Sequence, residues 1–275
     1  MDGERLRDFL EKSPDNIAVL TDYAAMEAFK SDTLANIQSS WTILSNFPKQ
    51  VIALKATREA ARVDPRAAGI ANRLIEKTQT QSISEFSRVL ASAAAGDWVT
   101  QTQLIQRGKW AKDHLERMLA KSDHMSQSIN EFCSVFSNEE LKRLRRKETW
   151  TPAIADKFRE LVFDETERAF VDHPDKLRWP GPKHIVNHFL FRHTLTYLVC
   201  VMELVKCGAT ERKAAKVRND AVDVIYGTFA TYYNGFMSDD TMALKTHQIT
   251  RDMLINMGAR IPEDYLEEYA LAIAD

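Results

Sequence analysis

The stretch VRNDAVDVIYGTFATYYNGFMSDDTMAL, residues 217–244, decides how the rest of the chain is interpreted. Its first part has the pattern of a helix, its middle that of a turn and a short apolar strand, and its end that of a new helix. Asp220 and Asp223 lie three apart on the expected helix, which places them on one face. Asp239 and Asp240 directly follow the expected strand. Because open α/β sheets bind ligands at the carboxyl ends of their strands, this stretch predicts an acidic ligand site.

A second strand pattern lies near the N-terminus. Residues 16–21 and 50–55 are short apolar runs, and residues 23–44 between them have a helical pattern. Strand, helix and strand with short connections predict a βαβ unit with a parallel sheet. Asp22 would then close the first strand, and Glu27 would lie on the first turns of the following helix.

Two further strand signals occur late in the chain, at residues 235–238 and 258–261. Residues 64–207 show helical periodicity with breaks and no comparable strand signal. We therefore predict a helix-dominated α/β protein with a small parallel sheet of roughly three to five strands. The sheet would belong to a discontinuous α/β domain, residues 1–63 and 208–275, and residues 64–207 would be an all-helical insertion.

Composition narrows the class of protein. With 44% hydrophobic and 28% charged residues, the chain of 275 residues is typical of globular proteins. The formal net charge of −2 means that any nucleic-acid surface must be a local patch rather than a property of the whole chain. The three cysteines have no paired metal-ligand spacing, and the charged N-terminus lacks the apolar core of a signal peptide. We expect a cytoplasmic protein without a membrane segment.

The order of these elements resembles the PIN-like nuclease family. That family has an Asp after its first strand, an Asp-bearing helix ahead of a later strand, and a Thr/Ser-x-Asp motif at the end of that strand. The helical segment of residues 64–207 is longer than the family usually has there, and its usual extra acid has no clear match, unless Glu27 or Glu59 replaces it. The similar segments are Thr21-Asp22, Asn219–Asp223 and Ser238–Asp240, within residues 14–58 and 210–265.

The resemblance implies a metal-dependent nuclease that hydrolyses phosphodiester bonds, and we expect RNA rather than DNA as the substrate. Converging carboxylates would repel one another, and Mg²⁺ or Mn²⁺ would compensate their charge because hard cations prefer oxygen ligands. The catalytic residues would be Asp22, Asp220, Asp223, Ser238 and Asp240, and the metal ligands Asp22, Glu27, Asp220, Asp223, Asp239 and Asp240.

Three alternatives stay open. Asp22 and Asp239 could instead cap helices, a common role for Asp after a strand. The whole chain could be a catalytically inactive PIN-like or helical scaffold, with the insertion docking a protein partner or forming a homodimer. Arg107 and His114 have a spacing similar to the Arg-x4–6-His motif of the HEPN family of metal-free ribonucleases, which would predict catalysis unaffected by chelators.

Basic residues and histidines supply further candidates. His184 and His188 lie four apart on an expected helix that also carries His193, a spacing that allows metal binding, although packing roles are more common. A phosphate-binding patch could come from any of three basic clusters. They are Arg107, Lys109, Lys112, Arg117 and Lys121; Lys142, Arg143, Arg145, Arg146 and Lys147, with Trp150 beside them; and Lys206, Arg212, Lys213, Lys216 and Arg218.

Overall fold

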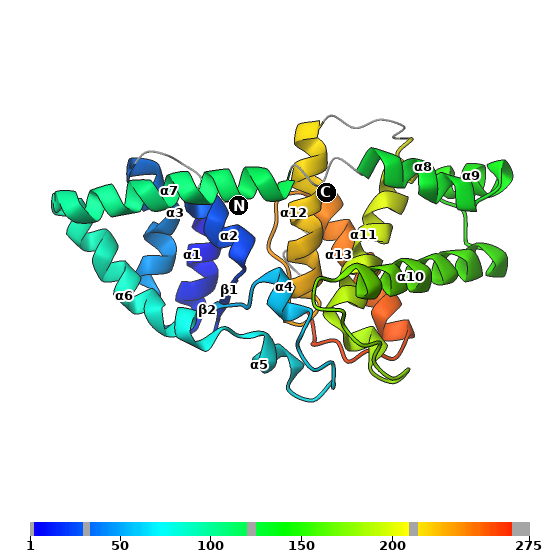
Figure 1. Cartoon of the computed structure of the whole chain (residues 1–275), viewed down its shortest axis with the longest axis horizontal. Helices are drawn as coiled ribbons and strands as arrows, with labels where there is room; N and C mark the ends of the chain where they lie inside the picture. The colour runs from blue at the N-terminus through cyan, green and yellow to red at the C-terminus, as the bar shows by residue number, and fades with distance from the viewer. Residues whose placement is uncertain (1–2, 30–33, 120–124, 209–213, 266–275) are drawn as a thin grey trace. The chain divides into compact units, whose positions relative to one another are not determined.

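The protein is described from a computed structural model, in which helices predominate over a small sheet (Figure 1). The prediction of a helix-dominated chain with a small parallel sheet is therefore confirmed. The described residues are 3–29, 34–119, 125–208 and 214–265.

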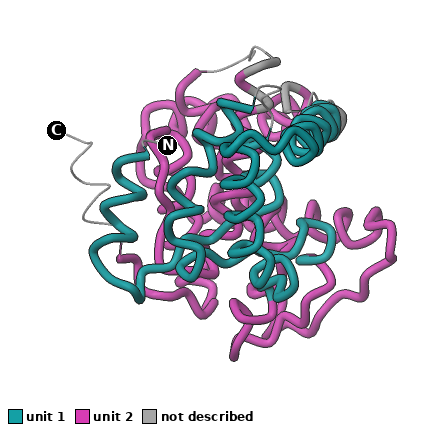
Figure 2. Tube along the Cα trace, turned by 90° about the vertical axis from the view of Figure 1, so that its left-hand side faces the viewer, with its two compact units in different colours: residues 1–60, 74–120 teal, residues 61–73, 121–275 magenta. Residues whose placement is uncertain are grey.

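The chain forms two compact units (Figure 2). Residues 77–119 of the expected insertion belong to the same unit as the N-terminal strands. The units thus divide the chain differently from the expected α/β domain and insertion. Unit 1 is residues 1–60 and 74–120, and unit 2 is residues 61–73 and 121–275.

Unit 1 contains the sheet. Strands β1 (Ala18–Leu20) and β2 (Val51–Ala53) pair in parallel, with their first residues opposite each other. Helices α2 (Asp22–Phe29) and α3 (Leu34–Asn46) lie between them in sequence, as the predicted βαβ order requires. Each strand has three residues and is therefore shorter than the apolar run, 16–21 or 50–55, that predicted it.

Helices α1, α6 and α7 pack on β2 or on the helices between the two strands. Helix α6 packs on β2, and α7 packs on α2 and α3. Their shared core consists of apolar side chains from α3, β2, α6 and α7, with Ile37, Ala93 and Leu104 fully buried. The bounds are α1 Gly3–Lys12, α4 Thr57–Ala60, α6 Lys77–Ala94 and α7 Trp98–Leu119.

Unit 2 is built around helix α11 (Phe189–Lys206), in which fourteen of eighteen residues are buried. Its run of apolar residues on all sides fits a helix that is enclosed by others. A short 3₁₀ turn, η2 (Ile185–Asn187), precedes it. The helices in contact with α11 are α8 Met125–Val135, α9 Asn138–Arg145, α10 Pro152–Asp172, α12 Ala214–Ala230 and α13 Thr241–Asn256, and α5 Ile70–Leu74 lies at the sequence boundary between the units.

Two helix starts follow directly from the sequence. The pattern Ser137-Asn-Glu-Glu140 predicts a capping box, and the structure has it at the start of α9, where each side chain accepts from the other residue's backbone amide. Thr151 caps α10 and Pro152 occupies its first turn, where a missing N–H costs nothing. These signals are local, so the sequence alone suffices to place them.

The predicted sheet of three to five strands is wrong for the described residues, where the sheet has two strands. Residues 235–238 are irregular, and Gly235, the first of them, has a positive φ of 151°. Residues 258–261 begin instead with the C-terminal cap of α13, where Gly258 is left-handed at φ 78° and the amide of Ala259 donates to the carbonyl of Leu254. An apolar run becomes a strand only where a neighbouring strand accepts its hydrogen bonds.

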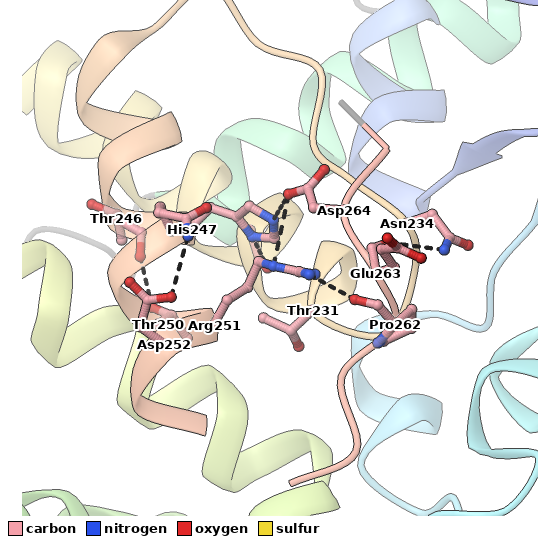
Figure 3. Close-up of polar contacts among 12 residues, drawn as sticks. Thr231, Asn234, Thr246, His247, Thr250, Arg251, Asp252, Pro262, Glu263 and Asp264 are labelled. Carbon is pink, nitrogen blue, oxygen red and sulfur yellow. Dashed lines mark hydrogen bonds and ion pairs between the residues drawn. The ribbon is translucent and has the colours of Figure 1, made fainter. Parts of the chain in front are cut away.

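The segment after α13 is fastened to unit 2 by side chains rather than by strand pairing (Figure 3). Arg251 donates to the carbonyl of Pro262 at 2.6 Å, and Asn234 donates its side-chain amide to the carbonyl of Glu263 at 2.9 Å. The amide of Tyr265 returns a hydrogen bond to the carbonyl of Asn234 at 2.8 Å. The sequence after Pro262 also predicts a last helix, which falls mostly on residues 266–275, outside the described residues.

Each helix in the described part of the chain is too short or too polar to span a bilayer.

Candidate functional site

The predicted site residues fall in both units. Asp22 and Glu27 belong to unit 1, and the acids and the serine of residues 220–240 belong to unit 2. Glu27 is half-buried on α2.

Asp22 lies at the carboxyl end of β1, as predicted, and is half-buried. One carboxylate oxygen accepts the amide of Thr57 at 3.2 Å and the other accepts the amide of Tyr23 at 2.9 Å. Burial raises the pKa of Asp22 above the ordinary carboxyl value, although these hydrogen bonds oppose the shift. Thr21 caps α2 through the amide of Ala24, so Asp22 instead ties the strand end to the start of α4.

Three of the predicted acids line one small hollow in unit 2. Asp220 and Asp223 come from α12, one turn apart, and Asp240 comes from the start of α13. The space that they enclose has a volume of about 10 Å³, which is close to the minimum for a single water molecule. Other side chains of α11, α12 and α13 complete the lining, namely Cys200, Val224, Met242, Ala243 and Thr246.

Asp240 also stabilises the start of α13. Its carboxylate accepts the amides of Met242 at 2.7 Å and Ala243 at 3.0 Å, so it is the N-cap of α13. Ser238 accepts the amide of Asp240 at 3.1 Å, and exposed Asp239 is not among the residues that line the hollow. The alternative that Asp239 caps the helix is therefore wrong, because the next residue does so.

Replacing Asp240 by alanine should destabilise the protein by about 1 kcal/mol, since two amides of α13 lose their acceptor. Asp240→Asn should retain nearly all of the stability, because asparagine is an equally good N-cap. Urea unfolding of both variants measures the difference. Equal midpoints for Asp240→Ala and the unchanged protein would contradict a capping role.

The carboxylate side chains that line the hollow are of the chemical kind that binds a divalent cation, but they are not arranged to hold one. Carboxylate and hydroxyl oxygens are the ligands that Mg²⁺ and Mn²⁺ prefer. Among the described residues, however, no three His, Cys, Asp or Glu side chains are arranged to hold a metal ion. No catalytic step through a metal follows from this arrangement.

The histidine candidates do not form a metal pair. His184 is exposed before η2, whereas His188 is buried and caps α11 by accepting the amide of Leu190 at 3.2 Å. The expectation that His184 and His188 share a helix face is wrong, because a 3₁₀ turn separates them. His193 lies inside α11 against Phe189, with ring centroids 6.1 Å apart.

A buried arginine is the feature that sequence reasoning missed. Arg192 is 0% exposed within α11 and donates to the carbonyl of Val186 at 3.1 Å, the carbonyl of Thr231 at 2.8 Å and the side chain of Asn187 at 3.0 Å. Its guanidinium also lies 4.0 Å from the ring centroid of Tyr232. The sequence signal that could have revealed this buried network is the position of a positively charged residue, Arg192, inside the apolar run of residues 185–207.

Glu203 is the second buried charge on α11. It pairs with Lys206 at 2.7 Å and Lys245 at 2.5 Å. Burial by itself would raise its pKa, but the two lysines outweigh burial and the pKa of Glu203 lies below the ordinary value. This glutamate therefore joins α11 to α13, and the two lysines already compensate its negative charge.

Comparison of the chain with protein-family models, with curated proteins and with solved structures found no match. A functional conclusion must therefore rest on the residues and contacts described above.

Proposed function

We propose that the protein is a divalent-metal-dependent nuclease that hydrolyses phosphodiester bonds, in RNA rather than DNA. The observation that carries the proposal is the hollow of unit 2, which is lined by Asp220, Asp223 and Asp240. These residues are separated by up to twenty positions in the chain and line one hollow of unit 2, whereas Asp22, the other predicted catalytic acid, lies in unit 1.

Two further observations support the proposal. The parallel pair β1–β2 with intervening helices has the order of the PIN-like family, and Asp22 stands at the carboxyl end of its first strand. Ser238 and Asp240 are linked by a hydrogen bond of 3.1 Å, so the Ser-x-Asp segment has a fixed local geometry. In a nuclease, the carboxylates would hold Mg²⁺ or Mn²⁺, which supplies charge stabilisation for the phosphodiester.

Mn²⁺ should raise the melting temperature, because a ligand that binds only the folded state adds about 2.7 kcal/mol at a hundred times its Kd. Asp223→Asn and Asp240→Asn should lose this shift, and both should lose cleavage of single-stranded RNA in Mn²⁺. Asp240→Asn is informative because asparagine preserves the helix cap while it removes the charge.

Asp252→Asn is the matched control, since Asp252 is an exposed carboxylate on the same helix α13. It should keep both the melting shift and the cleavage. Asp22→Asn, measured in the same way, tests the predicted ligand of unit 1. The proposal fails if Mn²⁺ leaves the melting temperature unchanged and neither RNA nor DNA is cleaved.

A helical scaffold that acts through protein–protein contacts is the second candidate function. It is favoured by one observation, that the described side chains include no group of three arranged to hold a metal ion. Absence of both a Mn²⁺ shift and cleavage would select this candidate. A normal melting transition in the same experiment would show that the protein is folded.

A further inference from the structure

Helix α7 of unit 1 has two different faces. Leu104, Ala111 and Leu115 are buried and face the core of the unit. The adjacent flank, about a quarter of a turn around the helix, carries polar and aromatic residues at spacings of four, three and four, which places them in one line along the helix. We name this line the Trp110 face, and it consists of Gln103, Arg107, Trp110 and His114.

Trp110 is the central residue of this face. Its side chain is 61% exposed, although large aromatic groups are usually buried. The ring stacks on the imidazole of His114, with centroids 5.1 Å apart and an interplanar angle of 12°. This contact holds the indole in one orientation, so a further ring could stack on it with a smaller loss of side-chain entropy.

A hollow lies directly beside the ring. It has a volume of about 400 Å³ and is lined by Gln103, Gln106, Arg107 and Trp110. All four lining residues lie on α7, so the hollow is open to solvent along the helix rather than enclosed. None of the four lining residues, all in the described part of the chain, is acidic.

The chemistry of these four side chains matches a nucleotide. Indole stacks on any base, guanidinium pairs with phosphate, and glutamine amides offer both donors and acceptors to base edges. We propose that the Trp110 face binds single-stranded nucleic acid, with one base stacked on Trp110 and an adjacent phosphate on Arg107. A single strand is required because bases in a duplex are already stacked on each other.

The other basic clusters are less suited to this task. In the cluster of residues 142–147, Arg143 lies 3.1 Å and Arg146 lies 3.8 Å from Glu148. In the third cluster Lys206 pairs with buried Glu203, while Arg212, Lys213 and the side chain of Arg218 lie outside the described residues. Arg107, by contrast, has no ion pair with any residue that the structure describes, so its charge is available to a phosphate.

This inference deepens the proposed function by naming a single strand as the substrate form. Binding of nucleic acid can be measured under conditions without cleavage, so the binding proposal and the nuclease proposal can fail independently of each other. The experiment uses the full chain in EDTA with fluorescein-labelled mixed-sequence oligonucleotides, one single-stranded RNA, one single-stranded DNA and one DNA duplex. Anisotropy gives the Kd at several salt concentrations.

Trp110→Ala should weaken single-strand binding by roughly tenfold, which is within the range measured for loss of one stacked base. Arg107→Ala should weaken binding at low salt and reduce the slope of log K against log salt by about one. Trp98→Ala is the matched control, because Trp98 is on the same helix, is 73% exposed, and lies outside the Trp110 face.

Equal losses in Trp110→Ala and Trp98→Ala would overturn the inference, as would duplex binding that is as tight as single-strand binding. Absence of saturable binding to all three oligonucleotides would also overturn it. In EDTA none of these outcomes depends on the acidic hollow, so the nuclease proposal is judged by its own assay.

Discussion

Arg192→Met should destabilise the protein by roughly 4 kcal/mol, the largest effect that we expect from a single side chain. Methionine fills much of the same volume but donates no hydrogen bond. The carbonyls of Val186 and Thr231 and the side chain of Asn187 would then lose their donor inside a buried region. Each unsatisfied buried acceptor costs about 1–3 kcal/mol.

The network also explains why the charge is tolerated. Burial lowers the pKa of Arg192 below the ordinary guanidinium value, which is the direction that desolvation of a cation produces. Its hydrogen bonds join three separate segments, since a further bond of 3.3 Å reaches the carbonyl of Arg260 and Tyr232 donates to the carbonyl of Asn187 at 2.9 Å. Loss of Arg192 should therefore loosen η2, the end of α12 and the segment after α13 together.

Guanidinium chloride unfolding at pH 7 measures this effect. Arg168→Met is the control, because Arg168 is exposed on α10 and pairs with Glu165 on the surface, where an ion pair is worth less than about 1 kcal/mol. Arg192→Lys should recover only part of the loss, since an ammonium lacks the planar fork. If Arg192→Met and Arg168→Met unfold at the same midpoint, the buried network does not carry the stability assigned to it.

Acidification should destabilise the protein by several kcal/mol between pH 7 and pH 5. Burial lowers the pKa of His188, His193 and His247 from 6.5 to about 4 in each case. Between these two values the unfolded chain binds more protons than the folded protein, so the free energy of unfolding rises with pH. The stability is fully present above about pH 6.5 and is lost as the pH falls toward 4, by about 2 kcal/mol for each histidine at pH 5.

Neighbouring charges modify this effect at two of the sites. Burial is the main cause at His247, Arg251 lowers its pKa further and Asp264 opposes the shift (Figure 3). At His188, burial is again the main cause and His173 adds to it. Protonation of His247 would bring a charge next to Arg251, so the segment after α13 should be among the first regions to loosen.

Urea unfolding at pH 7, 6 and 5 provides the test. His193→Phe, which keeps an aromatic ring next to Phe189, should show a fall in stability smaller by about 2 kcal/mol between pH 7 and pH 5. His184→Gln, at an exposed position, should follow the unchanged protein. A free energy of unfolding that is the same at pH 5 and pH 7 would contradict the lowered pKa values of these three histidines.

Local sequence signals determined much of the secondary structure. The order β1, helix, β2 and the caps at Ser137 and Thr151 depend on residues close together in the chain, so their physical causes are visible in the sequence. The strands at 235–238 and 258–261 could not be judged in this way. A strand exists only when another segment supplies its hydrogen bonds, and that partner is not specified locally.

The sequence by itself determined which residues carry charge and where helices begin, because both properties are encoded within a few positions. Only the tertiary structure decided that Asp220, Asp223 and Asp240 share one hollow, that Arg192 is buried, and that Trp110 is exposed. Whether a side chain is buried, and which other side chains lie near it, depend on the packing of segments that are distant in the chain. The same residue type can therefore be a surface charge, part of a buried hydrogen-bond network or part of a ligand site.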